Sequence, residues 1–129
     1  MGVYYHDVMI TLYGIPNCDT VKKARAWLTA QGIDYQFHDF KKQGVPADNL
    51  QAWSQAVGWE TLLNRKGTTW RKLDTTMQAS ITDDASAQTL MSAQASAIKR
   101  PVVDWGRGRI TVGFQDAFSA ELYTEYTQP

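Results

Sequence analysis

The first third of the chain carries three successive patterns of hydrophobic and polar residues. Residues 8–13 form an apolar run of strand length, which is typical of a central strand covered on both faces. Over residues 19–30 the apolar positions recur every three to four residues and Gly32 follows, which predicts an amphipathic helix ended by glycine. Residues 33–38 then alternate between apolar and polar, as a second strand does. This order predicts a βαβ unit with parallel strands and a right-handed crossover.

The middle of the chain, residues 41–97, shows helical spacing rather than strand-like alternation. The expected elements, in order, are a turn at residues 41–44, a helix opened by Pro46 and ended by Gly58, a short helical turn at residues 59–63, a basic polar loop at residues 64–72, a short helix at residues 74–80, and a helix capped by Thr82 or Asp83. This segment therefore reads as a helical insertion between two halves of a sheet.

The last third of the chain returns to strand-like patterns. Residues 98–105 and 109–114 are predicted strands, and the glycine-rich turn at residues 106–108 makes them an antiparallel hairpin. Asp116 is expected to cap a final helix. Taken in order, the elements predict an α/β fold with a four-stranded mixed sheet flanked by helices.

Two positions give this sheet a thioredoxin-like arrangement. A cysteine follows the first strand, and Pro101 opens the third. We expect a single domain over residues 1–129, with a thioredoxin-like core at residues 8–40 and 98–126 and the helical insertion at residues 41–97.

Composition narrows the classes of function. Thirteen basic and 13 acidic residues give a formal net charge of zero, which offers no argument for a nucleic acid or a membrane as partner. The single cysteine excludes an intrachain disulfide and favours a reducing compartment, so we expect a cytoplasmic protein. A monomer is also expected, although nothing in the sequence determines the oligomeric state. Residues 1–7 lack the features of a signal peptide, and no apolar run is long enough to span a membrane. No Cys, His and carboxylate cluster has metal-site spacing, so no metal is expected.

Cys18, the single cysteine, lies where the first strand ends and the first helix begins. Backbone N–H groups at a helix start lack intrahelical partners and the helix dipole is positive there, and both favour a thiolate. Lys22, one turn on, adds a positive charge that stabilises a thiolate further. We therefore expect a reactive nucleophile, the alternative being a buried, inert cysteine. Asn17 and Asp19 flank it, and either is expected to cap the helix rather than to act in catalysis.

Three motifs, in this order, resemble the ArsC/Spx family. They are GIPNCDTVKKA at residues 14–24, LLNRKGTTWRKL at residues 62–73 and IKRPV at residues 98–102. The similarity extends over nearly the whole chain, and within the family the chain resembles the YffB-type branch. The resemblance implies a thioredoxin-like fold with an inserted helical subdomain and chemistry centred on Cys18.

The family's arsenate reductases hold their oxyanion with three arginines, and the resemblance assigns two of them to Arg65 and Arg100. The third has no counterpart, because Gly113 stands at the matching place and Arg109, in the same predicted strand, lies four residues too early. The histidine that those reductases carry four residues before the cysteine is replaced by Gly14. Both departures argue against arsenate reduction.

The Spx regulators of the family, which bind RNA polymerase, often carry a Cys-x-x-Cys switch. Here Ile15 and Val21 stand three residues before and after Cys18, so that switch is absent. With one thiol, any disulfide on Cys18 must be resolved by an outside thiol, which predicts a glutathione-dependent thiol/disulfide oxidoreductase. Two alternatives stay open, namely an arsenate reductase coupled to glutathione or glutaredoxin and an Spx-like regulator that binds RNA polymerase.

The resemblance also implies how a thiol donor would be held. Arg65, Arg100 and Asn17 are expected to bind groups of the substrate or of glutathione. Pro101 is implied to be cis and to present the neighbouring backbone to a bound peptide. Glutathione, or a glutaredoxin-like thiol donor, is thus the expected co-substrate, and no tightly bound cofactor is expected. Trp70 is expected to pack in the core, the alternative being that it stacks on a ligand.

Overall fold

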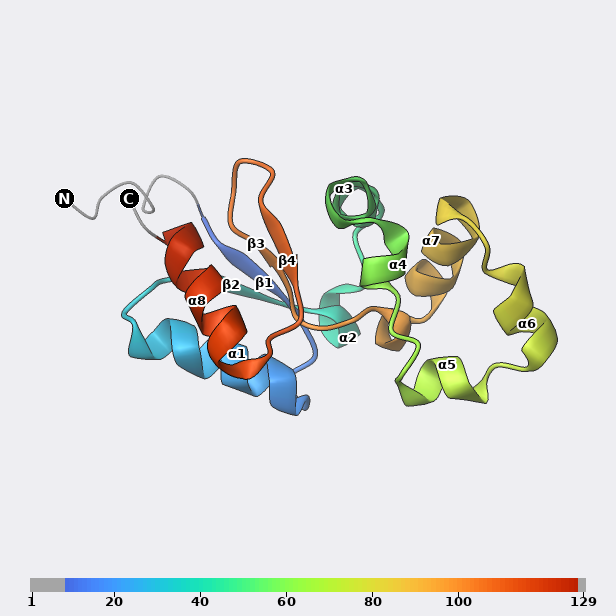
Figure 1. The fold of residues 1–129 in the computed structure, drawn as a ribbon, viewed down its shortest axis with the longest axis horizontal. Coiled ribbons are helices and arrows are strands. Elements are labelled where there is room, and N and C mark those ends of the chain that lie inside the picture. The colour runs from blue at the N-terminus through green and yellow to red at the C-terminus, as the bar shows by residue number, and fades with distance from the viewer. Residues whose placement is uncertain (1–8, 128–129) are drawn as a thin grey trace. The chain divides into compact units, whose positions relative to one another are not determined.

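The structure is a computed structural model that describes residues 9–127, apart from the side chains of residues 116–119. Residues 1–7, for which no signal peptide is expected, lie outside the described residues, as does the capping side chain expected of Asp116. The chain separates into two compact units (Figure 1). Unit 1 comprises Met1–Phe40 and Arg100–Pro129, and unit 2 comprises Lys41–Lys99. No helix in the described part of the chain has both the length and the apolar character needed to cross a membrane.

Unit 1 contains a four-stranded mixed sheet with the strand order β2-β1-β3-β4. β1 pairs with β2 in parallel, whereas the β1–β3 and β3–β4 pairs are antiparallel. The elements of this unit are β1 (Thr11–Gly14), α1 (Asp19–Ala30), β2 (Gln36–Asp39), β3 (Val102–Asp104), β4 (Ile110–Val112) and α8 (Asp116–Thr127). The predicted mixed sheet, parallel βαβ unit and antiparallel hairpin are all confirmed.

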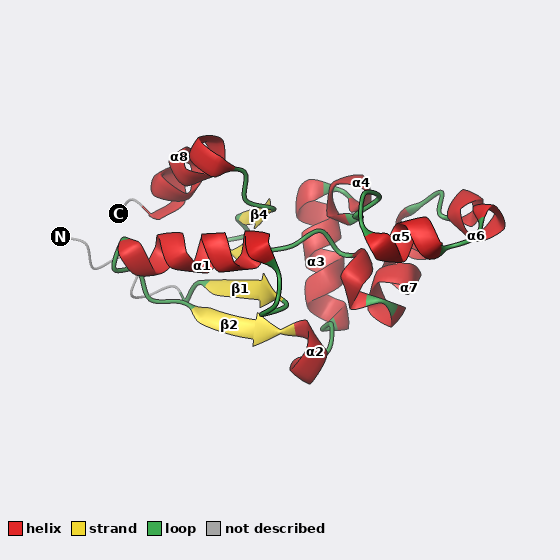
Figure 2. Ribbon diagram, turned by 90° about the horizontal axis from the view of Figure 1, so that it is seen from below, coloured by secondary structure: helices red, strands yellow, loops and turns green. Residues whose placement is uncertain are grey.

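Helices α1 and α8 pack side by side on one face of this sheet (Figure 2). The register places Leu12 of β1 opposite Val103 of β3, and both belong to the buried cluster beneath the helices. Across the two helices, the rings of Trp27 and Tyr123 meet edge to face at 5.5 Å. The side of α1 that turns to the sheet consists of the residues with predicted helical spacing, Val21, Ala24 and Leu28.

Tyr123 anchors α8 in this core. Its ring lies 4.5 Å from that of Trp105 and 5.0 Å from that of Phe114. Burial raises the pKa of the Tyr123 phenol well above its usual range, and the nearby Thr111 hydroxyl opposes this shift only in part. Trp105 Nε1 donates a hydrogen bond to Thr111 Oγ1 at 2.9 Å, so this buried N–H has an acceptor.

The two parallel strands start later than the apolar pattern predicted. β1 begins at Thr11 and β2 at Gln36, each three residues after the start of the predicted run. Before β1, the side chain of Met9 is 56% exposed, so the buried strand does not extend back over the whole apolar run. Before β2, the chain is still leaving α1, because the Ile33 N–H donates to the Leu28 carbonyl at 3.0 Å.

Unit 2 is helical, and α3, α4 and α7 pack on one another. Its elements are α3 (Ala47–Val57), α4 (Trp59–Leu62), α5 (Thr68–Lys72), α6 (Thr75–Ser80), α7 (Asp84–Ala93) and a 3₁₀ turn (Ala95–Ala97), with α2 (Phe40–Gln43) at the boundary between the units. The buried side chains at its centre include Leu50, Trp53, Leu62, Ala87 and Met91.

Three local expectations for this segment were wrong. Residues 41–43, predicted as a turn, belong to the helical turn α2. Pro46 is the N-cap of α3 rather than its first helical residue. Residues 68–72, predicted as part of a loop, form α5, where the Arg71 N–H donates to the Gly67 carbonyl at 3.2 Å. The polar, basic composition of this stretch concealed one turn of helix, because so short a helix has no apolar periodicity to detect.

Helix α7 begins with a capping box at Asp83, which decides between the two predicted caps. The Ser86 N–H donates to the Asp83 carboxylate at 2.9 Å, and this bond, with the Ser86 hydroxyl, lowers the pKa of Asp83 below its ordinary value of 3.8. The next carboxylate, Asp84, accepts from the Ser54 hydroxyl of α3 and from Gln88 Nε2. Both bonds lower the pKa of Asp84 as well, the Ser54 bond most.

Acid is expected to weaken unit 2 through these two carboxylates. Because folding lowers their pKa, their stabilisation is fully present above about pH 4 and is lost as the pH falls through the folded-state pKa. The variant Asp83→Asn/Asp84→Asn keeps amide caps that cannot titrate, so it should lose less thermal stability between about pH 5 and pH 3 than the unmodified chain. Circular dichroism during heating measures this loss. Asp34→Asn removes an exposed carboxylate that makes no hydrogen bond in the described part of the chain, and serves as the control.

Candidate functional site

Cys18 lies on the loop that leaves β1 and enters α1, within unit 1. It occupies the N-cap position of α1 with extended backbone (φ −142°, ψ 122°), and its carbonyl accepts from the Lys22 N–H at 2.9 Å. The side chain is half-buried and packs against the hydrophobic cluster of unit 1. Cys18 is therefore partly accessible rather than enclosed in the core.

The first turn of α1 has no side-chain cap. The side chains of Asn17 and Asp19, expected as caps, are exposed and make no hydrogen bond with the residues that the structure describes, so that prediction was wrong. The backbone stays extended through Cys18, and the capping position therefore falls on the cysteine itself. The first-turn N–H groups thus have no capping oxygen and can face the sulfur or an anion beside it.

The charges next to Cys18 have both signs. Lys22 and Asp19 are both exposed, and one favours a thiolate while the other opposes it. Arg25, further along the helix, is held in a packing contact, and its Nε donates to the Tyr35 hydroxyl at 2.9 Å. Its guanidinium carbon also lies 4.0 Å from the centroid of the Phe37 ring. The thiolate-stabilising role of Lys22 stays a prediction.

The sheet register brings a second candidate segment to the edge where Cys18 lies. Tyr13 pairs with Val102 in antiparallel register, so the residues that follow β1 and those that precede β3 leave the sheet at the same edge. Pro101 is buried there, and its carbonyl accepts from the Gly113 N–H at 2.8 Å. The Arg100–Pro101 bond is cis, as the resemblance implied, and Arg100 is half-buried.

Arg65, the other candidate arginine, belongs to unit 2. Its guanidinium carbon lies over the rings of Trp59 and Trp70, at 5.6 Å from each centroid. Both indoles are only half-buried, and Arg65 is exposed. The expectation that Trp70 packs in the core is therefore corrected, because much of its surface faces Arg65 and solvent. No pattern in the sequence connects Trp59 with Arg65, since the two lie on different local elements.

Two glycines stand where the family's reductases have functional side chains, and each has a local structural reason. A Cβ at Gly14 would lie 2.7 Å from Cγ2 of Val21, which is fully buried in α1. At Gly113 the backbone has φ 86°, a conformation that residues other than glycine rarely adopt. Arg109 does not replace the missing arginine, since its guanidinium lies over the Tyr126 ring at 5.3 Å.

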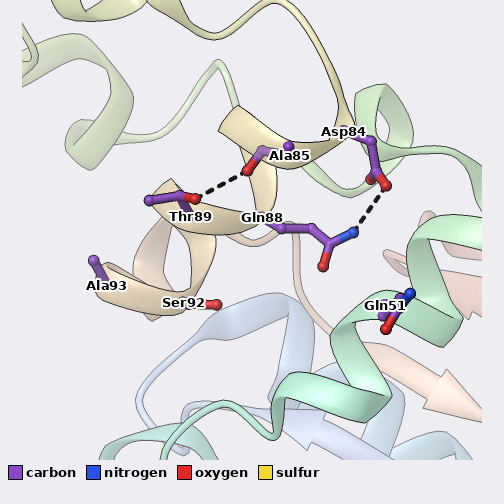
Figure 3. A pocket seen from close by; sticks show the side chains of 7 residues that line it. All are labelled: Gln51, Asp84, Ala85, Gln88, Thr89, Ser92 and Ala93. Carbon is purple, nitrogen blue, oxygen red and sulfur yellow. Dashed lines mark hydrogen bonds between the residues drawn. The ribbon is translucent and has the colours of Figure 1, made fainter.

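Unit 2 also has a hollow of about 740 Å³ beside α7 (Figure 3). Its lining is made of small and amide side chains and the carboxylate of Asp84, which accepts from Gln88 Nε2 at 2.9 Å. The hollow contains no cysteine or histidine. Nowhere in the described part of the chain do three His, Cys, Asp or Glu side chains gather as a metal site would require. The role of Cys18 as a nucleophile stays a prediction.

Comparison with known proteins identifies the family and agrees with the fold. The model of the ArsC family matches residues 13–121, most of the chain. The chain belongs to the ArsC family. A solved YffB protein is 46% identical and has a TM-score of 0.84. The match covers 92% of this chain and 99% of that one. An arsenate reductase (ArsC) related protein from Brucella melitensis is 49% identical, with a TM-score of 0.72 and coverage of 90% of this chain and 95% of that one.

A regulator is also among the relatives of this ArsC family member. The global transcriptional regulator Spx of Streptococcus pyogenes is 29% identical over 122 residues, which cover 92% of this chain and 88% of that protein. The expected relationship to ArsC, YffB and Spx proteins and the thioredoxin-like fold are thus confirmed. Relatives named for arsenate reduction make this a family with oxidoreductases, and relatives named Spx show that it also contains regulators.

Proposed function

We propose that this ArsC family protein is a glutathione-dependent thiol/disulfide oxidoreductase that uses Cys18 as its single nucleophile. The observation that supports the proposal is the position of Cys18. It is the half-buried N-cap residue of a helix whose first turn has no side-chain cap, and it lies at the sheet edge that also carries Pro101. A thiolate at such a position is favoured by the N–H groups of the helix start. A partly accessible side chain also leaves room for the sulfur of a substrate.

A chain with one thiol must work through a monothiol cycle. In the first step the Cys18 thiolate attacks the glutathionyl sulfur of a mixed disulfide, forms a Cys18–glutathione disulfide and releases the substrate thiolate. In the second step the thiolate of a second glutathione attacks that disulfide, which forms oxidised glutathione and returns Cys18 as a thiolate. In sum, one S–S bond of the substrate is broken and one S–S bond of oxidised glutathione is formed, so the substrate thiol is released at the expense of one glutathione thiol. A glutaredoxin-like thiol is an alternative donor for the second step.

Residues near Cys18 supply the binding groups in this proposal. Arg100 provides a guanidinium suited to a carboxylate of glutathione, and Asn17 provides an exposed amide. Pro101 lies at the same sheet edge, and Lys22 supports the thiolate. Arg65 belongs to unit 2, and its expected role in binding substrate or glutathione stays a prediction.

Arsenate reduction is the weaker alternative, because two side chains of the family's reductases are missing at Gly14 and Gly113. The packing against Val21 and the backbone at Gly113 support their absence as a structural feature of this chain. An Spx-like regulator that binds RNA polymerase is favoured by the 29% identity to Spx. Such a regulator would not require a catalytic cycle at Cys18, so replacement of Cys18 by serine would leave the biological phenotype unchanged.

Glutathione is expected to bind at the Cys18 edge of unit 1. In an NMR titration of the reduced protein with glutathione, the largest shifts should fall on Cys18, on Arg100 and on the carbon signals of Pro101. A tripeptide in which alanine replaces the cysteine of glutathione keeps both carboxylates, and should reproduce the shifts of Arg100 but weaken those of Cys18. Absence of shifts at these residues, or shifts confined to a distant surface, would remove the proposed site.

A further inference from the structure

Unit 2 has a second hollow, between α6 and α7, the two helices drawn in shades of yellow in Figure 1. It measures about 390 Å³ and is lined entirely by residues between 73 and 94, so it lies within one unit. Its apolar walls come from Leu73, Met77, Ile81, Leu90 and Ala93. A largely apolar concavity of this size is typical of a small-molecule site. We call it the α6–α7 hollow.

The helices that carry these walls are held in place by hydrogen bonds. In α6, Gln78 Nε2 donates to the Trp70 carbonyl at 2.9 Å. The Met77 N–H donates at 2.7 Å to the carboxylate of Asp74, which is the N-cap of α6. On the other side of the hollow, α7 begins with the capping box described above. The concavity is therefore formed before a ligand arrives, and binding does not have to order its walls.

Three of the four polar side chains at the hollow already donate within the protein. Ser80 Oγ donates to a carbonyl of α6 at 2.6 Å, and Thr89 Oγ1 donates to a carbonyl of α7 at 3.0 Å. The Ser86 hydroxyl is used by the capping box with Asp83. The fourth side chain, that of Gln94, is exposed, and its amide makes no hydrogen bond with any described residue. Among the lining side chains, Gln94 alone thus keeps free hydrogen-bond donors.

No charged side chain lines the α6–α7 hollow. The sequence between Lys72 and Lys99 contains no lysine or arginine, and its three acidic residues, Asp74, Asp83 and Asp84, lie at the starts of α6 and α7. An anion in the hollow would therefore lose its hydration, find no counter-charge and face like charges nearby. A cation would lose its hydration without a carboxylate to pair with inside the hollow. The charge pattern favours an uncharged ligand.

The surface around the hollow favours a ligand that fits inside it over a docked protein. In the described part of the chain, the large hydrophobic side chains that are exposed are those of Met9 and Met77, and Met77 alone belongs to unit 2. A protein partner would need an apolar centre within an interface of roughly 800 Å² per partner. Scaled from a cavity of about 150 Å³ that holds benzene, the hollow accommodates about 10–15 non-hydrogen atoms.

We propose that the α6–α7 hollow binds a small uncharged ligand that has an alkyl or aryl body and one hydroxyl or amide group. The body packs against the apolar walls, where the flexible thioether of Met77 adapts to its shape. The polar group exchanges a hydrogen bond with the free amide of Gln94. This site goes beyond the proposed function and does not depend on it, because all of its residues belong to unit 2.

Fluorine NMR with matched probes tests the chemistry of this site. The uncharged aryl alcohol 4-fluorophenethyl alcohol has about ten non-hydrogen atoms and should bind with a Kd of about 0.1–1 mM. The probes 4-fluorophenylacetate and 4-fluorophenethylammonium have nearly the same shape but carry a negative and a positive charge. Each should bind more weakly than the alcohol by about tenfold or more, because the hollow supplies no counter-charge.

Variants locate the binding. Ala93→Phe places a ring in the hollow and should weaken binding of the alcohol by about tenfold or more. Ala85→Phe makes the same change on the same helix but outside the α6–α7 hollow, and should leave Kd unchanged. Both alanines are exposed, so neither change enters the core. Gln94→Ala should weaken binding of the alcohol by about two- to fivefold and leave that of 4-fluoroethylbenzene, which lacks the hydroxyl, unchanged.

The inference is overturned if the alcohol shows no saturable binding, if either charged probe binds as tightly as the alcohol, or if Ala93→Phe and Ala85→Phe have equal effects. Gln94→Ala keeps the test decisive where Ala93→Phe unfolds, because the Gln94 side chain is exposed and makes no hydrogen bond in the described part of the chain. Unchanged affinity of this variant for the alcohol would contradict the proposed ligand. Self-association in sedimentation that Ala93→Phe abolishes would instead assign the hollow to a second copy of the chain and reject the small-molecule site.

Discussion

Replacement of Cys18 by serine is expected to abolish thiol–disulfide exchange, with a loss of about a thousandfold or more in rate. A serine hydroxyl is not ionised at neutral pH and cannot form a mixed disulfide, and the chain has no second cysteine to take over. The fold should persist, because serine is close to cysteine in size and Cys18 makes no side-chain cap. The measurement is the reduction of a glutathionylated peptide by glutathione, followed by mass spectrometry.

Two lysine variants act as matched partners for this test. Lys22→Gln should slow the alkylation of Cys18 by iodoacetamide by about two- to fivefold, as expected for the loss of one exposed charge near a thiolate. Lys23→Gln removes a neighbouring exposed charge and should change the rate less. A Cys18→Ser variant with full exchange activity would contradict the mechanism. So would a Cys18 that is alkylated more slowly than free cysteine.

Introducing the histidine of the family's arsenate reductases at position 14 is expected to destabilise the protein by about 1–3 kcal/mol or more without creating arsenate reduction. Even the Cβ of Gly14→Ala would lie 2.7 Å from Val21 Cγ2, so β1 and α1 must move apart or Val21 must leave its rotamer. Activity should not appear, because the arginine expected at Gly113 is missing as well. Denaturant unfolding and an arsenate assay with glutathione and glutaredoxin measure the two effects.

A double-mutant cycle identifies the cause of this loss. Val21→Ala removes the methyl groups that approach Gly14, so Gly14→Ala should cost about 0.5–3 kcal/mol less in that background than alone. Additive effects would show that another contact is responsible. Arsenate turnover by Gly14→His alone would refute the argument that two missing side chains, rather than one, separate this chain from the reductases.

Periodicity predicted the elements that are long or alternate cleanly. Helix α1 has the predicted bounds, Asp19–Ala30, because its apolar face repeats over three turns and its ends are marked by a loop and by Gly32. The short helix α5 was missed, because one turn has no period to measure. The strand starts at Thr11 and Gln36 were also missed, since they depend on where the sheet pairs rather than on where the apolar run begins.

For the candidate site too, some features follow from the sequence and others only from the tertiary structure. Sequence alone determined that one cysteine lies between a strand and a helix, that an outside thiol must resolve any disulfide on it, and that an arginine–proline step opens a later strand. The register of Tyr13 with Val102 decided that this step and Cys18 meet at one sheet edge, and the run of extended backbone decided that Cys18 itself is the N-cap. The contacts of Arg65 with Trp59 and Trp70 were likewise decided in three dimensions. Local patterns specify which backbone each segment prefers, whereas contacts between segments depend on register and packing, which arise only when all segments are assembled.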